Sequence, residues 1–199
     1  MVKFKLFNRW DTSDILVVDP GLKAYVTLNP VLVPKSSGRN AKNRFWKSKD
    51  HIVERLMNKL QVPGHKGKKH FRTSGHCTGK GVHVYDTVVK TFQIIEEQTK
   101  QNPVQVFIKA LENAAPREEI TTIEYGGARY PQAVDCAPQR RVDIALRNFI
   151  IGAYGRSFGK KTKLPNALAD ELMLAFKGDQ GSQAISKKLE LERQADSSR

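Results

Sequence analysis

The sequence has few cysteines and no long apolar run, and each shortage excludes a class of protein. Only Cys77 and Cys136 occur in 199 residues, so we expect two reduced thiols rather than a disulfide framework. No stretch approaches the roughly 18 apolar residues of a membrane-spanning helix, and the first residues lack the apolar run of a secretory signal. These shortages predict a cytoplasmic protein without membrane contact or redox chemistry.

Acidic residues are also scarce relative to basic ones. Asp and Glu number 20 against 34 for Lys and Arg, which gives a formal charge of +14 and a pI near 9.9. Such an excess favours a polyanionic partner, with nucleic acid as the first candidate. Residues 35–49 and 63–81 contain no acid at all, and a third basic stretch covers residues 156–163. Each stretch alone could be a solvated face, but the three together favour a long polyanion over a point ligand.

Hydrophobic periodicity predicts a mainly α fold in one domain with appendages. Apolar residues recur at helical spacing in six segments, and Ser48 is the expected N-cap of the first. Residues 63–81 are rich in Gly and charge, so we expect a flexible loop there without RNA. The six helices are expected near residues 49–61, 82–101, 103–114, 138–155, 165–178 and 182–199.

The rest of the chain predicts a β-ribbon and an N-terminal arm. The hydrophobic period changes to two on either side of Gly126 and Gly127, which can supply the positive φ of a tight turn. Residues 1–29 show only short, broken runs, so we expect an extended arm that packs on another surface. The sequence thus predicts a bundle of about six helices over residues 30–199, with a protruding hairpin at about residues 120–135.

The hairpin and the helix after it carry the most informative cluster of side chains. An isolated two-stranded ribbon is marginal in water, and this one carries Arg129 and Gln132 with little to bury, so it requires a partner. Arg140 and Arg141 lie in the first turn of a helix, where the helix dipole disfavours cations. Arg147 lies two helical turns beyond Arg140 and can share its side of the helix. These positions suit phosphate contacts better than they suit helix stability.

Two points remain open from the residues alone. The arginines could instead pair with Asp135, Asp143 or Glu124 and only solubilise the surface, although the excess of cations across the chain favours a polyanion. In the first basic stretch, Phe45 and Trp46 could anchor the loop to the core or stack on bases.

A metal site is the first alternative that we considered. His65, His70, His76, Cys77 and His83 match no compact Cys/His pairing scheme, and the sequence has no CxxC. We therefore expect neither metal nor cofactor. A metal-dependent nuclease that uses His76, Cys77 and His83 is the corresponding rival function.

Other catalytic motifs are weaker still. Residues 74–81 resemble a phosphate loop but lack its first Gly and its final Ser or Thr. The adjacent carboxylates Glu118 and Glu119 have no nucleophile tied to them. We expect no enzymatic activity and no small-molecule substrate. A helix-turn-helix DNA regulator is the second rival, but no pair of helices joined by a short turn and carrying base-reading residues stands out.

One block of sequence resembles a known family. Residues 126–150, GGARYPQAVDCAPQRRVDIALRNFI, are similar to the signature of the universal small-subunit ribosomal protein seven family, whose eukaryotic members are called small-subunit protein five. The resemblance continues in IVERLMNKLQ, in QNPVQVFIKALENAAPREE, in LADELMLAFKG and in AISKKLELERQADSSR. It covers the chain from about residue 29 to the C-terminus and is to the archaeal and eukaryotic type.

The resemblance implies a helical bundle with a β-ribbon arm that binds the 3′ major domain of 16S ribosomal RNA and nucleates assembly of the subunit head. It also implies neighbouring head proteins as partners and a place at the subunit interface near the exit-site transfer RNA and the messenger RNA. The RNA-facing residues that it implies by position are Arg39, Lys42, Arg44, Arg55, Gly126, Gly127, Arg129, Gln132, Arg140, Arg141 and Arg147. The basic stretches add Lys68, Lys69, Arg72, Lys160, Lys161 and Lys163.

Overall fold

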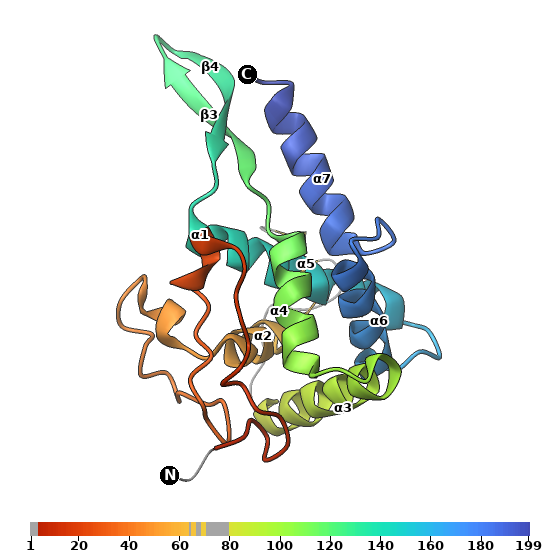
Figure 1. Ribbon diagram of the computed structural model, residues 1–199. Helices are drawn as coiled ribbons and strands as arrows, with labels where there is room; N and C mark the ends of the chain where they lie inside the picture. Colours follow the sequence, from red (N-terminus) through yellow and green to blue (C-terminus); the bar gives the residue numbers. More distant parts are fainter. Residues whose placement is uncertain (1–3, 64, 67–68, 71–79) are drawn as a thin grey trace.

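The computed structural model describes residues 4–63, 65–66, 69–70 and 80–199, and it confirms the mainly α fold (Figure 1). The helices are α1 Pro20–Lys23, α2 Ile52–Leu60, α3 Gly81–Thr99, α4 Pro103–Ala114, α5 Pro138–Ser157, α6 Leu164–Lys177 and α7 Gln183–Asp196. Six of them, α2 to α7, correspond to the six predicted segments. None of the helices in the described part of the chain is long and apolar enough to cross a membrane.

The core lies around α4, which is buried along most of its length. Asn102 begins this helix by accepting a hydrogen bond from the backbone of Val104 at 3.0 Å, and Pro103 follows at the first helical position. Val106 and Phe107 of α4 are fully buried. Helices α3, α5 and α6 pack around α4, as Figure 1 shows. The apolar stripes predicted for these helices therefore meet in one core.

Helix α2 begins later than predicted, and Ser48 is not its N-cap. The Ser48 hydroxyl donates to the Phe45 carbonyl at 2.8 Å within a 3₁₀ turn at Trp46–Lys49, and Ser48 lies four residues before Ile52, too early in the chain to be the N-cap of α2. The Nδ1 atom of His51 takes that place and accepts from the backbone N–H of Val53 at 3.2 Å. Burial lowers the pKa of His51 to about 4, which keeps the imidazole neutral and able to accept.

Part of the predicted loop at residues 63–81 has regular structure. Strand β1 His65–Lys66 pairs with β2 Lys69–His70 in antiparallel register. The expectation of irregular structure is therefore wrong for these four positions. The expected flexibility of the loop is not tested, and most of its residues lie outside the described part of the chain.

The N-terminal segment packs on α3 and α4, and its apolar side chains belong to the common core. Leu6, Phe7 and Trp10 are buried. The Phe7 ring meets the ring of Tyr85 on α3 edge to face at 4.9 Å, and the Trp10 indole donates to Glu96 of α3 at 3.1 Å. Figure 1 shows the segment running beside α4 towards α1. The surface on which the predicted N-terminal segment packs is thus the protein's own helical bundle.

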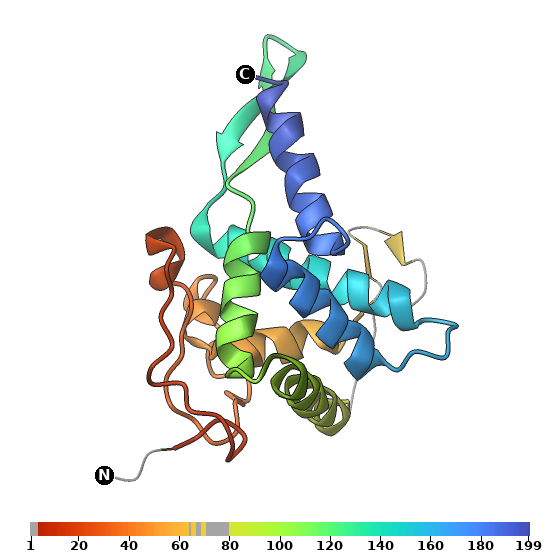
Figure 2. The same cartoon turned by 45° about the vertical axis from the view of Figure 1, so that its right-hand side comes forward.

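The predicted hairpin is confirmed as a ribbon that projects from the body. Strand β3 Glu118–Tyr125 pairs with β4 Ala128–Asp135 in antiparallel register. Gly126 and Gly127 form its turn with φ of 58° and 82°, a region that L side chains rarely adopt. Figures 1 and 2 both show the ribbon reaching away from the helices, with α7 beside its base. We call this ribbon, residues 118–135, the arm.

Helix α7 is docked at its start and braces the arm along its length. The buried carboxylate of Glu171 accepts from the Ser182 hydroxyl at 2.7 Å and from the backbone of Ala184 at 3.1 Å. Further along α7, Glu192 accepts from the backbone of Arg117 at 3.0 Å, directly before β3. The arm therefore leaves the body in a direction that α7 helps to hold.

Candidate nucleic-acid interface

The structure divides the predicted RNA-facing residues by their access to solvent. Lys68 and Arg72 lie outside the described residues, and only the backbone of Lys69 is described. Arg55 and Arg141 are buried, with 5% and 9% of their surface exposed. The exposed members are Arg39, Lys42, Arg44, Gly126, Gly127, Arg129, Gln132, Arg140, Arg147, Lys160, Lys161 and Lys163.

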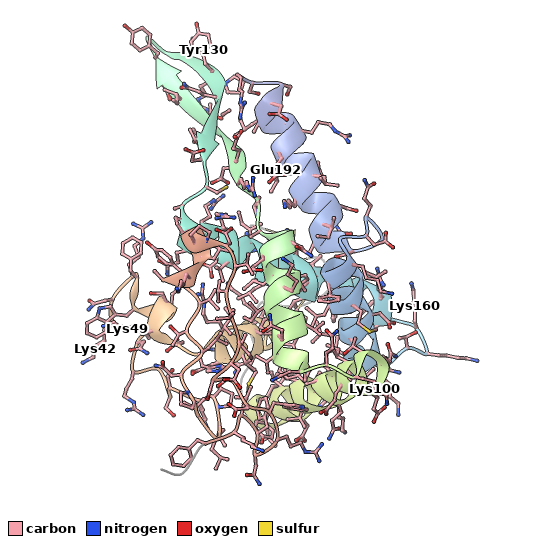
Figure 3. The ribbon with its side chains drawn as sticks, in the orientation of Figure 1. Lys42, Lys49, Lys100, Tyr130, Lys160 and Glu192 are labelled. Atoms are coloured by element: carbon pink, nitrogen blue, oxygen red, sulfur yellow. The ribbon has the colours of Figure 1, made fainter. Side chains whose placement is uncertain are left out.

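The first exposed group is a basic projection formed by residues 39–49. Its backbone is held to the body because Thr27 Oγ1 donates to the Ser48 carbonyl at 2.7 Å, and Asn40 donates to Asp50 at 2.6 Å. Figure 3 shows Lys42 and Lys49 at one edge of the molecule, with their side chains extending into solvent. Positive charge is thus presented on a supported turn whose sequence contains no acid, and Lys47 is its only cation with an ion pair in the described part of the chain.

A second group of cations lies where α2 meets α5, around one carboxylate. Asp143 of α5 forms ion pairs with Lys47 and with Arg55, the latter at 3.1 Å. Burial alone would raise the pKa of Asp143, but the hydrogen bonds and charges of these two cations outweigh it and hold that pKa below its ordinary value. Asp143 therefore stays ionised near neutral pH.

Lys59 and Arg147 complete this α2–α5 cluster. Burial lowers the pKa of Lys59, and the neighbouring charges of Arg147, Lys47 and Arg55 lower it further against the attraction of Asp143. Only Lys47 and Arg55 of these four cations pair with Asp143, so the cluster keeps a surplus of positive charge that suits an anionic ligand. Lys47 and Lys59 were not among the predicted residues. Lys59 follows Arg55 by four positions, and this spacing on one helix face was the signal available.

The two buried arginines hold the protein itself together. Arg55 donates to the Tyr25 carbonyl at 2.9 Å in addition to its ion pair with Asp143. Arg141 donates to the Pro116 carbonyl at 3.1 Å and to Asp19 at 2.6 Å. Each guanidinium is satisfied by internal carbonyl and carboxylate oxygens, which favours a structural role for these two residues, and their predicted contact with RNA is not tested. We leave both out of the interface proposed below.

Arg140 pairs with a carboxylate of the arm and is also exposed to solvent. Its guanidinium donates to both carboxylate oxygens of Glu119 on β3, at 2.5 and 2.6 Å, and this interaction raises its pKa. Its side chain is nevertheless 56% exposed. Arg140 thus clamps the start of α5 to the arm while its outer edge faces solvent. The carboxylates that pair with Arg140 and Arg141 are Glu119 and Asp19. Neither is among the alternatives that the sequence offered, which were Asp135, Asp143 and Glu124.

The distal arm is exposed on both of its faces. Every residue from 121 to 132 is exposed, including Tyr125 at 82% and Tyr130 at 58%. Figure 3 shows Tyr130 at the far end of the ribbon. The only ion pair described on this part of the arm joins Arg129 and Glu124 at 3.6 Å, and both side chains are largely exposed. Such a ribbon buries little within the monomer, so its surface is available to a partner.

The last exposed group is the loop between α5 and α6. Lys160, Lys161 and Lys163 are exposed, and no ion pair involving them occurs in the described part of the chain. In Figure 3, Lys160 lies at the opposite edge of the body from Lys42. The structure therefore does not gather all the predicted residues on one patch but distributes them over several projections.

The metal hypothesis finds no support in the described residues, among which no three His, Cys, Asp or Glu side chains form a group that could hold a metal ion. His76 and Cys77, the residues on which the nuclease hypothesis depends, lie outside that part of the chain.

Comparisons with known proteins agree with the resemblance seen in the sequence. The family model described as "Ribosomal protein S7p/S5e" matches residues 24–199. A protein of Nanoarchaeum equitans is 54% identical over the full length of both chains. Proteins of Methanococcus aeolicus and Methanococcus vannielii are 45% and 44% identical over this whole chain and over 100% and 97% of their own lengths. All three relatives are called "Small ribosomal subunit protein uS7". The chain belongs to the ribosomal protein S7p/S5e family.

Proposed function

We propose that this chain is a structural protein of the small ribosomal subunit that binds ribosomal RNA and catalyses no reaction. The observation that carries the proposal is the exposed distal part of the arm, together with a surplus of surface cations. The arm from residue 121 to 132 buries almost nothing in the monomer, and Arg147 and Lys160 have no ionic partner in the described part of the protein. A folded polyanion would cover the exposed surface of the arm and would supply negative charge to the cations that have no ionic partner.

We further propose that the RNA is the 3′ major domain of 16S ribosomal RNA and that binding nucleates assembly of the subunit head in the cytoplasm. The sequence of residues 126–150 supports this assignment through its resemblance to the family signature, and the names of the archaeal relatives support a place in the small subunit. We also propose that neighbouring head proteins are partners and that the chain lies at the subunit interface near the exit-site transfer RNA and the messenger RNA, as the resemblance implies.

Binding would depend mainly on phosphate contacts, with selectivity from RNA shape. Lysines and arginines that neutralise phosphates release counterions, so log affinity falls by about 0.7 to 0.9 per neutralised phosphate on a log salt scale. The deep, narrow major groove of A-form RNA prevents base reading there, so a protein recognises its grooves, loops and backbone path. Three separate projections suit a folded RNA better than a straight duplex.

A filter-binding comparison tests the proposal. The ligands are a transcript of the archaeal 3′ major domain and duplex DNA of the same length, each measured from low to moderate NaCl. We expect the transcript to bind more tightly at every salt concentration. Equal affinity for the two ligands would mean that the protein binds any polyanion, and tighter binding to DNA would favour the regulator hypothesis.

The nuclease hypothesis needs its own measurement, because RNA binding alone does not exclude it. Purified protein would be analysed for bound metal and incubated with the transcript while the RNA length is followed. We expect intact RNA and no stoichiometric metal. Metal at one equivalent together with multiple-turnover cleavage would contradict a purely structural role.

A further inference from the structure

We propose that Phe45 is a stacking site for an unpaired base of the bound RNA, with Trp46 beside it. This inference rests on the proposed function, and it assigns an aromatic contact to a surface otherwise described only by charge. The sequence left two roles for these rings, an anchor to the core or a platform for bases.

The exposure of the two rings decides against the anchor. Phe45 is 65% exposed and Trp46 is 39% exposed, whereas the core aromatics Phe92 and Phe107 are fully buried. Neither Phe45 nor Trp46 belongs to the hydrophobic core. Leaving a large aromatic ring in water forgoes the free energy that its burial would contribute, so an exposed pair indicates a partner that covers it.

The backbone that carries these rings is held in place. The Phe45 carbonyl accepts from the backbone N–H of Ser48 at 3.2 Å and from its hydroxyl at 2.8 Å. The backbone N–H of Trp46 donates to the Asn43 carbonyl at 3.2 Å, and Lys47 pairs with Asp143 of α5. The rings therefore stand on a turn fixed to the body, and little conformational entropy remains to be lost when a base stacks on them.

Cations flank both rings, so the partner that covers them is anionic, and among anionic partners nucleic acid also supplies flat bases that stack on rings. The Arg44 guanidinium lies over the Phe45 ring at 5.8 Å from its centroid, and the Lys49 ammonium lies over the Trp46 ring at 4.2 Å. A base on the open face of Phe45 would bring its own phosphate close to such cations. A basic protein surface would instead be repelled by residues 35–49, which contain no acid.

The base must be unpaired, because only a base that leaves the helix stack can lie flat on a side chain. Loops, bulges and strand ends of a folded ribosomal RNA supply such bases. Stacking requires only a π face, so the site would favour an accessible base over a particular base identity. The Phe45 contact would therefore depend on the structure of the RNA, whereas the contacts of the cations depend only on its charge.

Substitution of Phe45 separates stacking from charge. Phe45→Leu keeps an apolar side chain without the ring, and we expect it to weaken binding to the 3′ major domain transcript about 5- to 150-fold, the range that base–aromatic stacking supplies. The slope of log affinity against log salt should not change, because no cation is removed. Phe45→Tyr retains the ring and should bind within about threefold of the wild type. Leu16→Ala, which removes another exposed apolar side chain, should bind like the wild type.

The outcomes distinguish this inference from the proposed function. If the wild type prefers the transcript but Phe45→Leu binds equally well, the stacking site is excluded and the proposed function stands. A weaker Phe45→Leu variant with a flatter salt slope would show that the ring only positions Arg44, which also excludes stacking. If the wild type shows no preference for the transcript, the proposed function itself fails. Thermal unfolding of each variant verifies that the fold is intact.

Discussion

The Nη2 atom of Arg141 donates a hydrogen bond to Oδ2 of Asp19 at 2.6 Å, across 122 positions of the chain. Arg141 also donates through Nε to the carbonyl of Pro116, close to the start of β3. Asp19 directly precedes α1. The Arg141 side chain of α5 therefore links the N-terminal segment to the residues just before the arm. A Cβ atom on the neighbouring Gly21 would lie 3.2 Å from Arg141 Nη1, so a larger residue there would crowd this link.

Removal of either partner of this pair should destabilise the fold. Their side chains are 11% and 24% exposed, so Asp19→Asn or Arg141→Ala leaves a largely buried group without its ionic partner. We expect a loss of about 2–4 kcal/mol in the free energy of unfolding, somewhat below the cost for a fully buried pair. The double variant should lose less than the sum of the two. Urea unfolding measures all four proteins, and strictly additive losses would contradict the pairing.

The carboxylates of Asp19 and Asp143 should make stability depend on acidic pH. Burial would raise the pKa of each, but hydrogen bonds and charges from their cationic partners outweigh it and place both below the ordinary value of 3.8. The unfolded chain therefore binds more protons at low pH, so this stabilisation is complete above the unfolded pKa and is lost as pH falls through the folded values. Asp143→Asn should lose less stability than the wild type between pH 6 and pH 3 in urea titrations. An equal loss would show that Asp143 does not contribute.

The loop between α5 and α6 should contribute phosphate contacts without contributing stability. Lys160→Ala should reduce the salt slope of RNA binding by about 0.7 to 0.9 and leave thermal unfolding unchanged. Lys187→Ala is the matched control, because its cation is exposed but already paired with Glu190 at 2.6 Å. Filter binding over a range of NaCl gives both slopes. If the two variants have the same slope, Lys160 lies outside the interface.

Shortening the arm should weaken RNA binding and leave the protein folded. Ile120 and Ala133 are register partners, so removal of residues 121–125 and 128–132 would join them through Gly126 and Gly127 in a shorter hairpin. We expect Tm to change by no more than about 2 °C, because all the removed residues are exposed. Affinity for the transcript should fall at least about tenfold, since the distal arm can no longer contact RNA. A large drop in Tm would show that the arm is part of the folding unit, and unchanged affinity would remove it from the interface.

Much of the fold could be predicted from the sequence because its signals are local. Helices α2 to α7 follow from apolar residues repeated every three or four positions, and the arm follows from a period of two around Gly126 and Gly127. The family also follows from a contiguous block, residues 126–150. The start of α2 was predicted wrongly because two side chains near it, Ser48 and His51, can both accept hydrogen bonds, and only the geometry of the turn at Trp46–Lys49 selects between them.

The sequence by itself determined the excess of positive charge, the helical periods, the hairpin turn and the family signature, since each depends on composition or on neighbouring residues. Only the tertiary structure decided which cations face solvent. Arg55 and Arg147 look alike in the sequence, yet Arg55 is buried against a carboxylate 88 positions away while Arg147 is exposed. The physical reason is that a guanidinium enters the interior only where folding brings oxygen acceptors to it, and those acceptors come from segments that no local pattern connects.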